Sequence, residues 1–235
     1  MTARPATAAR HDAAIAATAL LVLLGWEASG LDMVLASLYG SAGGFALRND
    51  GWTRHLLHDG GRWLATVALL ACAAWAWHGS GAPLTMTRRQ RGSWLLAIVA
   101  GLVLVPALKR FSHTSCPWDL ALFGGDVPYV PHWLPLLVDG GPGHCFPSGH
   151  AVAAFAFLPL YFQWRDHRPA LAGGLLATVL TFGALFGWAQ LARGAHFPSH
   201  TLWSAWLCWV IGVLAARIIE RRDRLLGPSP ARARV

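Results

Sequence analysis

The segment that decides the fold is HCFPSGHAVAAFAF, residues 144–157, in which a short polar stretch runs directly into apolar sequence. Backbone N–H groups at the start of a helix lack intrahelical partners and lie at the positive end of its dipole, an arrangement that favours an anion. Gly149 allows the backbone to approach such an anion closely. The segment therefore fits a phosphate site. It fits equally well a simple helix start, with Ser148 as the N-cap and His150 reaching the membrane interface.

The composition is that of a membrane protein. Of the 235 residues, 55% are hydrophobic and 13% are charged, whereas ordinary soluble domains carry about 25% charged residues. The formal net charge is +8, but the basic residues stand in short clusters between apolar runs rather than along one polar face. We therefore expect the lipid bilayer as a partner and no nucleic acid.

Six apolar segments follow one another along the chain, approximately at residues 13–26, 63–77, 94–108, 151–164, 171–191 and 201–219. Several are shorter than the roughly 20 residues of a straight membrane span, but Trp and semi-polar flanks extend them into the interface. The first also resembles a signal peptide, although Trp26-Glu27 is a poor cleavage region. We expect an all-α membrane protein with about six transmembrane helices, one domain over 1–225, and a disordered basic tail over 226–235.

Basic residues cluster on one side of these segments and predict the topology. They precede the first segment, follow the sixth, and occupy the second and fourth connections, at Arg4, Arg10, Arg88, Arg89, Arg91, Arg165, Arg168 and the run RIIERRDR. The positive-inside rule places this side in the cytoplasm together with both termini. The loops 29–62, 109–147 and 193–199 then face the periplasm of a bacterial inner membrane.

The four cysteines fall into two pairs. Cys72 and Cys208 lie within apolar segments and are expected to be small buried side chains. Cys116 and Cys145 share the second outer loop, in a compartment that permits disulfides. They form a candidate disulfide, or two free thiols in one loop.

A second group of polar residues, ARGAHFPSHTLW, lies at 192–203, also at the outer mouth of an apolar segment. It contains Arg193, His196 and His200. A neutral imidazole can attack phosphorus, and a second imidazole can protonate the leaving oxygen. His196 and His200 are also spaced to share one zinc ion, although Pro198 between them disfavours a regular helix and an adjacent Glu is lacking.

Two cations complete the outer face. Lys109 and Arg110 follow the third apolar segment, in LKRFSHTSCPWDL. Alone they would only anchor a helix to lipid phosphates. Together with the two histidine-containing groups, they predict a phosphate site on one membrane face.

These motifs resemble those of the type 2 phosphatidic acid phosphatase superfamily, integral-membrane lipid phosphate phosphatases with the motifs K-x6-R-P, P-S-G-H and S-R-x5-H-x3-D. The second motif is intact at residues 147–150, and Lys109 and Pro117 match the first. His196 matches the histidine of the third motif. The departures are Cys116 for the first-motif Arg, Ala189-Gln190 for Ser-Arg, and His200 for the final Asp.

The departures have chemical consequences. Arg193 follows Gln190 by three residues and is expected on the same helical face, where it would supply the missing guanidinium. Arg110 is a candidate replacement for the Arg lost at Cys116. The family Asp orients the nucleophilic histidine, a role that His200 would take without supplying a negative charge. Asp119 and Asp126 are the candidate acids to support it.

The resemblance implies dephosphorylation of a lipid phosphate or diphosphate without metal or cofactor. The implied catalytic residues are His196, which forms a phosphohistidine, His150, which protonates the leaving group, and His200. The implied phosphate-binding residues are Lys109, Arg110, Ser148, Gly149 and Arg193. The substrate classes are undecaprenyl diphosphate, a lipid A phosphate or phosphatidylglycerol phosphate. A lipid phosphotransferase using the same site and a non-catalytic lipid-phosphate-binding protein remain alternatives.

Overall fold

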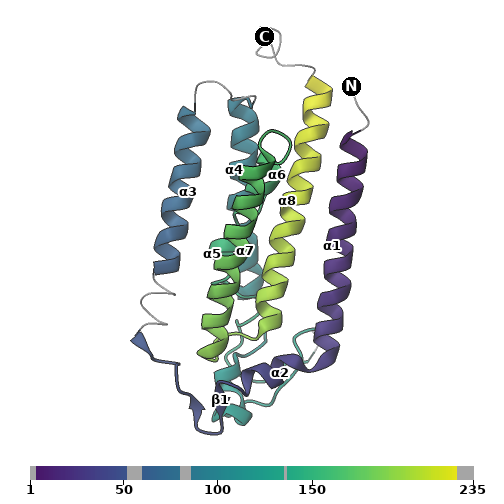
Figure 1. The fold of residues 1–235 in the computed structure, drawn as a ribbon. Coiled ribbons are helices and arrows are strands. Elements are labelled where there is room, and N and C mark those ends of the chain that lie inside the picture. The colour runs from purple at the N-terminus through teal and green to yellow at the C-terminus, as the bar shows by residue number, and fades with distance from the viewer. Residues whose placement is uncertain (1–3, 52–59, 80–85, 135–136, 227–235) are drawn as a thin grey trace.

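The computed structural model describes residues 4–51, 60–79, 86–134 and 137–226. The expected tail, from residue 227 onward, lies outside these ranges. Long helices run side by side along the molecule, and the first helix begins at the same end at which the last helix finishes (Figure 1). They are α1 (Arg4–Ser29), α3 (Gly60–His78), α4 (Arg88–Arg110), α7 (Pro169–Ala192) and α8 (Pro198–Leu226). The expected all-α fold class is confirmed.

Four helical segments are long and apolar enough to cross a membrane, namely Thr7–Ser29, Arg88–Arg110, Pro169–Ala192 and Pro198–Leu225. The other two expected spans are α3, which packs against α4, and a shorter apolar stretch, Val152–Trp164. That stretch divides into α5 (Val152–Phe155) and α6 (Pro159–Trp164). Proline has no backbone N–H and suits the first turn of a helix, so Pro159 begins a new helix there.

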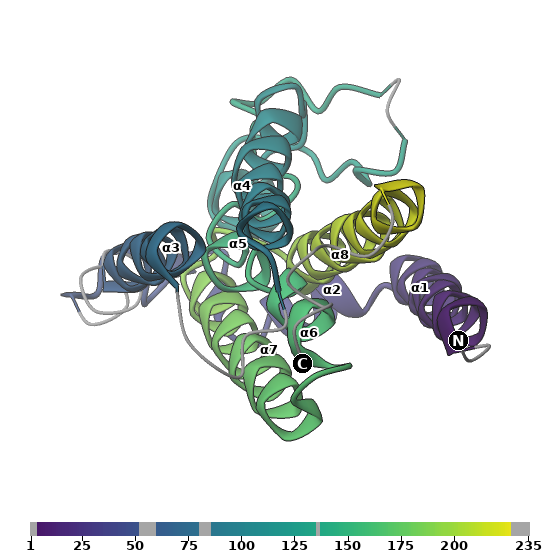
Figure 2. The same ribbon diagram turned by 90° about the horizontal axis from the view of Figure 1, so that it is seen from above.

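The short helices α5 and α6 lie at the centre of the bundle, between α4, α7 and α8 (Figure 2). Val152 and Phe155 of α5 are buried in one apolar cluster with Cys208. A Cβ at Gly183 of α7 would overlap the Phe155 ring, and such small residues let membrane helices approach closely. The helix that follows the PSGH motif is therefore fixed by the core itself. Cys208 is buried as expected, whereas Cys72 is only partly buried and packs against the same cluster.

The end of the molecule opposite the termini is built from short elements and loops (Figure 1). These are α2 (Leu31–Ala36), the antiparallel hairpin β1 (Gly40–Ser41) and β2 (Gly44–Phe45), and the 3-10 helices η2 (Pro117–Asp119) and η3 (Ala121–Phe123). They share a second apolar cluster, which consists of Ala36, Phe45, Leu120, Phe123, Leu191 and Phe197. This cluster joins the outer loops to the start of α8.

Asp32 of α2 caps α8 from outside the helix. Its carboxylate accepts the backbone N–H of Ser199 at 3.0 Å, the Ser199 hydroxyl, and Nε1 of Trp26 at 2.8 Å. Burial raises the pKa of Asp32 above its ordinary value, and the hydrogen bonds from Ser199 and Trp26 oppose this shift. A carboxylate at a helix N-terminus satisfies donors that the helix leaves open. Asp32 thereby fixes the first turn of α8, where His200 stands.

A disulfide between Cys116 and Cys145 closes the long loop that connects α4 to α5, with Cα atoms 5.2 Å apart. Cys145 N–H also donates to the carbonyl of Thr114 at 2.9 Å. Asp139 accepts from the backbone and hydroxyl of Ser115 at 2.7 and 3.0 Å. The disulfide and these hydrogen bonds thus fix the loop immediately before the PSGH motif.

Candidate active site

The PSGH turn is attached directly to the first turn of α8. The N–H of Ser148 donates to the carbonyl of His200 at 3.1 Å. The Ser204 hydroxyl lies 2.9 Å from the carbonyl oxygens of both Ser148 and His200. Two segments that are about fifty residues apart in the sequence are therefore held in one fixed register. This is the convergence that the sequence analysis predicted for the second and third motifs.

Three histidines meet at this junction. The Nδ1 atoms of His196 and His200 are 3.4 Å apart, and the ring centroids of His150 and His196 are 5.9 Å apart. His196 is 2% exposed and His200 is fully buried. Where two imidazole nitrogens face each other at this distance, one must donate and the other accept. When His196 donates through Nδ1, its Nε2 keeps a lone pair for a reaction.

The surroundings of His196 keep it neutral. Burial lowers the pKa of His196 well below its ordinary value, and the positive charge of Lys109 lowers it further, followed by His200 and His150. A neutral imidazole is the nucleophilic form. The charges of Lys109 and His150 act on His196, so they would also act on a group bound at His196.

Lys109 stands over the PSGH turn. A Cβ built on Gly149 would lie 3.9 Å from the Lys109 Nζ and 3.7 Å from its Cδ. Glycine therefore leaves open the space between the ammonium group and the backbone N–H groups of the turn. This space is a candidate cradle for an anion, bounded by a cation, by the backbone N–H groups of the turn other than that of Ser148, and by the histidines.

The turn between α7 and α8 sets the position of His196. Gly194 has φ 74°, and the N–H of Ala195 donates to the carbonyl of Gln190 at 2.8 Å. A helix commonly ends in this way, with a left-handed glycine that satisfies its last carbonyls. A Cβ at Gly194 would overlap the ring of Phe45. Glycine is required here by both conformation and space.

The two arginines predicted to bind phosphate differ in their surroundings. Arg193 ends α7, is 9% exposed, and donates through Nε to the carbonyl of Arg48 at 3.2 Å. Arg110 is exposed at the end of α4. The structure therefore groups Lys109 with the histidines and leaves the Arg110 side chain on the surface.

The two acids predicted as partners of His200 lie elsewhere in the structure. Asp119 accepts the backbone N–H of Cys116 at 3.2 Å and so caps η2. Burial raises the pKa of Asp119 above its ordinary value, against this hydrogen bond and the charge of Arg48. Asp126 is exposed. Neither acid is among the partners of His200 in the part of the chain that the structure describes.

A different acid lies behind His200, and the sequence analysis did not find it. Glu27, at the end of α1, has Oε1 2.8 Å from Nε2 of His132 and accepts Nε1 of Trp203 at 2.8 Å. The His132 ring lies edge to face with the His200 ring at 5.1 Å. One signal was available, because a carboxylate inside an apolar membrane segment is costly unless it is paired. Its partner could not be identified from sequence spacing.

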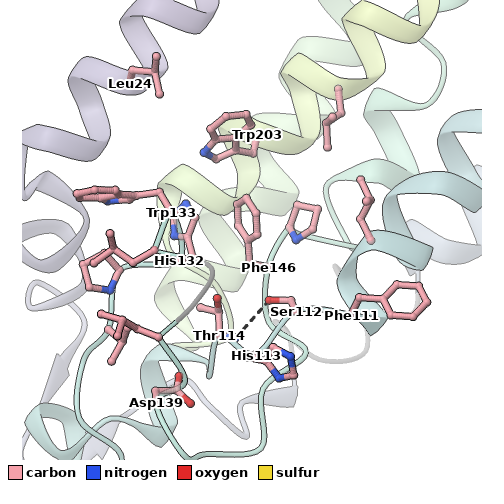
Figure 3. A pocket seen from close by; sticks show the side chains of 17 residues that line it. Leu24, Phe111, Ser112, His113, Thr114, His132, Trp133, Asp139, Phe146 and Trp203 are labelled. Carbon is pink, nitrogen blue, oxygen red and sulfur yellow. Dashed lines mark hydrogen bonds between the residues drawn. The ribbon is translucent and has the colours of Figure 1, made fainter.

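An apolar cavity of about 510 Å³ opens beside the junction. Its walls come from α1, α4, α8 and the outer loop, including Leu24, Leu108, Phe111, Val130, Trp133, Leu137, Phe146, Pro147, Trp203 and Leu207. Figure 3 shows Phe146 between His132 and Trp203, and the His132 and Phe146 rings stack at 4.1 Å. Because Pro147 lines the cavity and directly precedes Ser148, an apolar chain bound here would lie next to the PSGH turn.

Cys145, His196 and His200 form the one group of potential metal ligands found among the described residues, with ligand atoms within 4.8 Å of one another. The Cys145 sulfur is bonded to Cys116 and offers no thiolate. Two neutral imidazoles remain, fewer than the three or four protein ligands usual at zinc sites. The donor set does not favour the zinc alternative, and the absence of a metal from the reaction stays a prediction.

Comparisons with known proteins agree with the fold and the motifs. The chain has the fold of a crystal structure of a transmembrane PAP2-type phosphatidylglycerolphosphate phosphatase from Bacillus subtilis, with TM-score 0.53 and 18% identity over 90% of this chain and 97% of that one. Phosphatidylglycerophosphatase B of Haemophilus influenzae is 26% identical over 96 residues. That match spans 40% of this chain and 40% of the relative's length.

The family model of the PAP2 superfamily matches residues 92–224. This range begins near the start of α4 and reaches the last turn of α8, so it includes Lys109, the PSGH turn and both histidines of the third motif. With its membrane-length helices and this fold, the chain is a multi-pass membrane protein. The match covers more than half of the sequence, and the protein therefore belongs to the PAP2 superfamily.

Proposed function

We propose that this protein removes phosphate from a membrane lipid phosphate or diphosphate without a metal ion, through a phosphohistidine on His196. The observation that carries the proposal is the contact of His196 Nδ1 with His200 Nδ1 at 3.4 Å. It directs the second ring nitrogen of a neutral imidazole away from His200, beside a cradle formed by Lys109 and the Gly149 turn.

The reaction has two displacements. In the first, Nε2 of His196 forms a bond to phosphorus while the bond from phosphorus to the lipid oxygen breaks, and protonated His150 gives its proton to that oxygen. In the second, His150 takes a proton from water as the water oxygen attacks phosphorus. The N–P bond then breaks, and inorganic phosphate leaves. Lys109, Arg193 and the turn N–H groups hold the phosphoryl oxygens, where charge stabilisation contributes most to the rate.

The proposed substrate is a lipid, since the wall of the apolar cavity includes Pro147, next to Ser148, and Leu108 and Leu207 of membrane-length helices. Undecaprenyl diphosphate, a lipid A phosphate and phosphatidylglycerol phosphate all combine a phosphate with apolar chains. The names of the two similar proteins favour phosphatidylglycerol phosphate among the three.

The proposed location is a bacterial inner membrane, with both termini in the cytoplasm and the site on the periplasmic side. The end of α3, the start of α4 and the end of α6 lie at the same end as the start of α1 and the end of α8, and the first turn of α8 lies toward the other end (Figure 1). Single cysteines introduced near Arg89 and at Asp126 should be labelled by an impermeant reagent only from the cytoplasmic and periplasmic faces respectively. Labelling from the reverse faces would overturn the orientation.

The function is tested with purified protein and a panel of the three lipid classes, by measuring phosphate release with and without a chelator. We expect release that the chelator does not reduce and that His196→Ala lowers by about a hundred-fold or more. The matched control is His144→Asn, since His144 is exposed with φ 56°, a conformation that Asn tolerates. Phosphate found on a second lipid would indicate a phosphotransferase. Activity that requires added metal, or no turnover of any lipid, would refute the proposal.

A further inference from the structure

A carboxylate from the first helix reaches the back of the histidine cluster. The Glu27 and His132 side chains are buried to 7% and 5% exposure, with Oε1 and Nε2 at an ion-pair distance of 2.8 Å but without hydrogen-bond geometry. Trp203 donates to the same Oε1 at 2.8 Å. Glu27 lies outside the segment that the family model matches, which begins at residue 92. The contact is thus made by a part of the chain that the motifs do not include.

His132 is packed against His200 rather than against solvent. Its ring contacts the His200 ring at 5.1 Å with an interplanar angle of 87°, and Phe146 contacts His200 similarly at 5.3 Å and 75°. The buried Nε2 of His200 has no hydrogen-bond partner among the described residues, while its Nδ1 faces His196. The rings of His132 and Phe146 stand nearly perpendicular to the His200 ring, and an N–H that meets the face of a ring is stabilised weakly by its π electrons. This environment suits the tautomer of His200 that carries its proton on Nε2.

We propose that Glu27 and His132 are positioning residues that hold His200 in its Nε2–H tautomer and supply the negative charge that position 200 lacks. His200 then accepts the Nδ1 proton of His196, and the lone pair of His196 Nε2 points to phosphorus. The inference rests on the proposed function, because its catalytic effect is exerted through His196. Its structural part, the tautomer, stands independently of activity.

The other charged groups around the cluster do not fill this role. His200 is faced by His196, His132, Lys109, and both the backbone carbonyl and the disulfide sulfur of Cys145. Asp32, the other carboxylate near Glu27, is engaged by Ser199 and Trp26. Tyr129 also lies near both acids, and its pKa is raised by burial and by their charges, so it remains a neutral phenol. Among the described residues, Glu27 is the acid that contacts a ring packed on His200.

The charge of Glu27 acts when His196 becomes cationic. As the N–P bond forms, the ring of His196 gains positive charge, and a carboxylate two rings away stabilises it, as the acid of a hydrolase triad does at shorter range. Because the interaction crosses a second ring in a largely buried site, its effect is smaller than that of a direct carboxylate. We expect about a ten-fold contribution to kcat.

The first test is Glu27→Gln, which keeps the shape and an oxygen for Trp203 but removes the charge. We expect kcat to fall about ten-fold with KM nearly unchanged. The acidic limb of the kcat/KM profile should move to lower pH, because losing a negative charge lowers the affinity of His196 for a proton. Asp126→Asn is the matched control, since it removes an exposed carboxylate from the same end of the protein and should change neither quantity.

A second variant, His132→Phe, tests the same inference if the Glu27→Gln protein does not fold. His132→Phe keeps a ring stacked on Phe146 but removes the nitrogen that meets Glu27. It should reproduce the fall in kcat and the shift of the acidic limb, and the double variant should lose little more than either single one. A lower melting temperature with an unchanged kcat and pH profile would show a structural role only and overturn the inference.

The tautomer is measured directly from 15N chemical shifts in histidine-labelled protein, with the His200 signals assigned by their absence in His200→Gln. We expect one Nε2–H tautomer in the unmodified protein and a mixture in Glu27→Gln. If the His200 15N shifts are the same in the unmodified protein and in Glu27→Gln, the inference is overturned, whatever the activity of the two proteins. An inactive protein with the expected tautomer change would instead refute the proposed function and leave the positioning role standing.

Discussion

His196 and His200 face each other through Nδ1 atoms 3.4 Å apart. At position 200 the resemblance to the family leads one to expect a carboxylate. The ring found there can accept one proton from His196 but carries no negative charge of its own. In the proposed mechanism, a ring nitrogen of His200 therefore keeps the orientation of His196, and the electrostatic part of the role passes to more distant groups.

His150 is predicted to matter most for lipids with poor leaving groups. His150→Gln should lower kcat by about a hundred-fold or more for an alkyl phosphate lipid, because the departing alkoxide then lacks a proton donor. With p-nitrophenyl phosphate, whose leaving group needs little protonation, we expect a loss of less than about ten-fold. Rates of phosphate release with both substrates provide the check. An equal loss with both would assign His150 to binding rather than to proton transfer.

The disulfide is predicted to stabilise the site loop. The bonded cysteines are separated by 29 residues, a loop for which chain entropy predicts about 3–4 kcal/mol. Cys116→Ser with Cys145→Ser should lower the melting temperature and the activity, because the loop ends at the PSGH turn. In denaturant, a maleimide should label Cys72 and Cys208 before reduction and all four cysteines after it. Four labels before reduction would show that the bond is absent from the protein.

Two glycines near the site are predicted to respond differently to alanine. At Gly149 a Cβ meets the Lys109 side chain at 3.7 Å, an ordinary contact. Gly149→Ala should therefore fold normally but fill the cradle, and raise KM about ten-fold. Gly194→Ala places a Cβ against the Phe45 ring and puts an L-residue at the φ of 74° that Gly194 adopts. This change should lower the free energy of unfolding by about 1–3 kcal/mol. Thermal melts and KM values separate the two; a Gly149→Ala protein with unchanged KM would place the phosphate elsewhere.

The sequence predicted the parts of this molecule that depend on local pattern. The apolar segments, the intact PSGH turn and the His196–His200 spacing are readable because each lies within a short stretch. The division of the fourth segment at Pro159 was missed, since the apolar pattern continues across it. The pairing of Glu27 with His132 could not be predicted, because Glu27 lies in α1 and His132 in the outer loop, and the two meet only where both elements pack on α8.

The last prediction concerns the ring at position 200. Burial and the charge of Lys109 hold the pKa of His196 well below the ordinary imidazole value, which is about 6.5. A histidine with a lowered pKa loses its nucleophilic lone pair only when the pH falls below that value, so the acidic limb of the kcat/KM profile should lie below pH 6.5 or so. His200→Asp places a carboxylate beside Nδ1 of His196, and a negative neighbour raises the affinity of an imidazole for a proton.

The acidic limb of His200→Asp should therefore move to higher pH than in the unmodified protein, and turnover at the plateau should be preserved or improved. His200→Asn is the matched control, because it has nearly the same size without the charge and should leave the limb at low pH. The measurement is the kcat/KM profile from pH 4.5 to 8.5 for the three proteins, with lipid binding measured in parallel. A His200→Asp protein that folds and binds lipid but is inactive at every pH would mean that the ring at position 200 does something that a carboxylate cannot, and that the two-displacement mechanism needs another partner for His196.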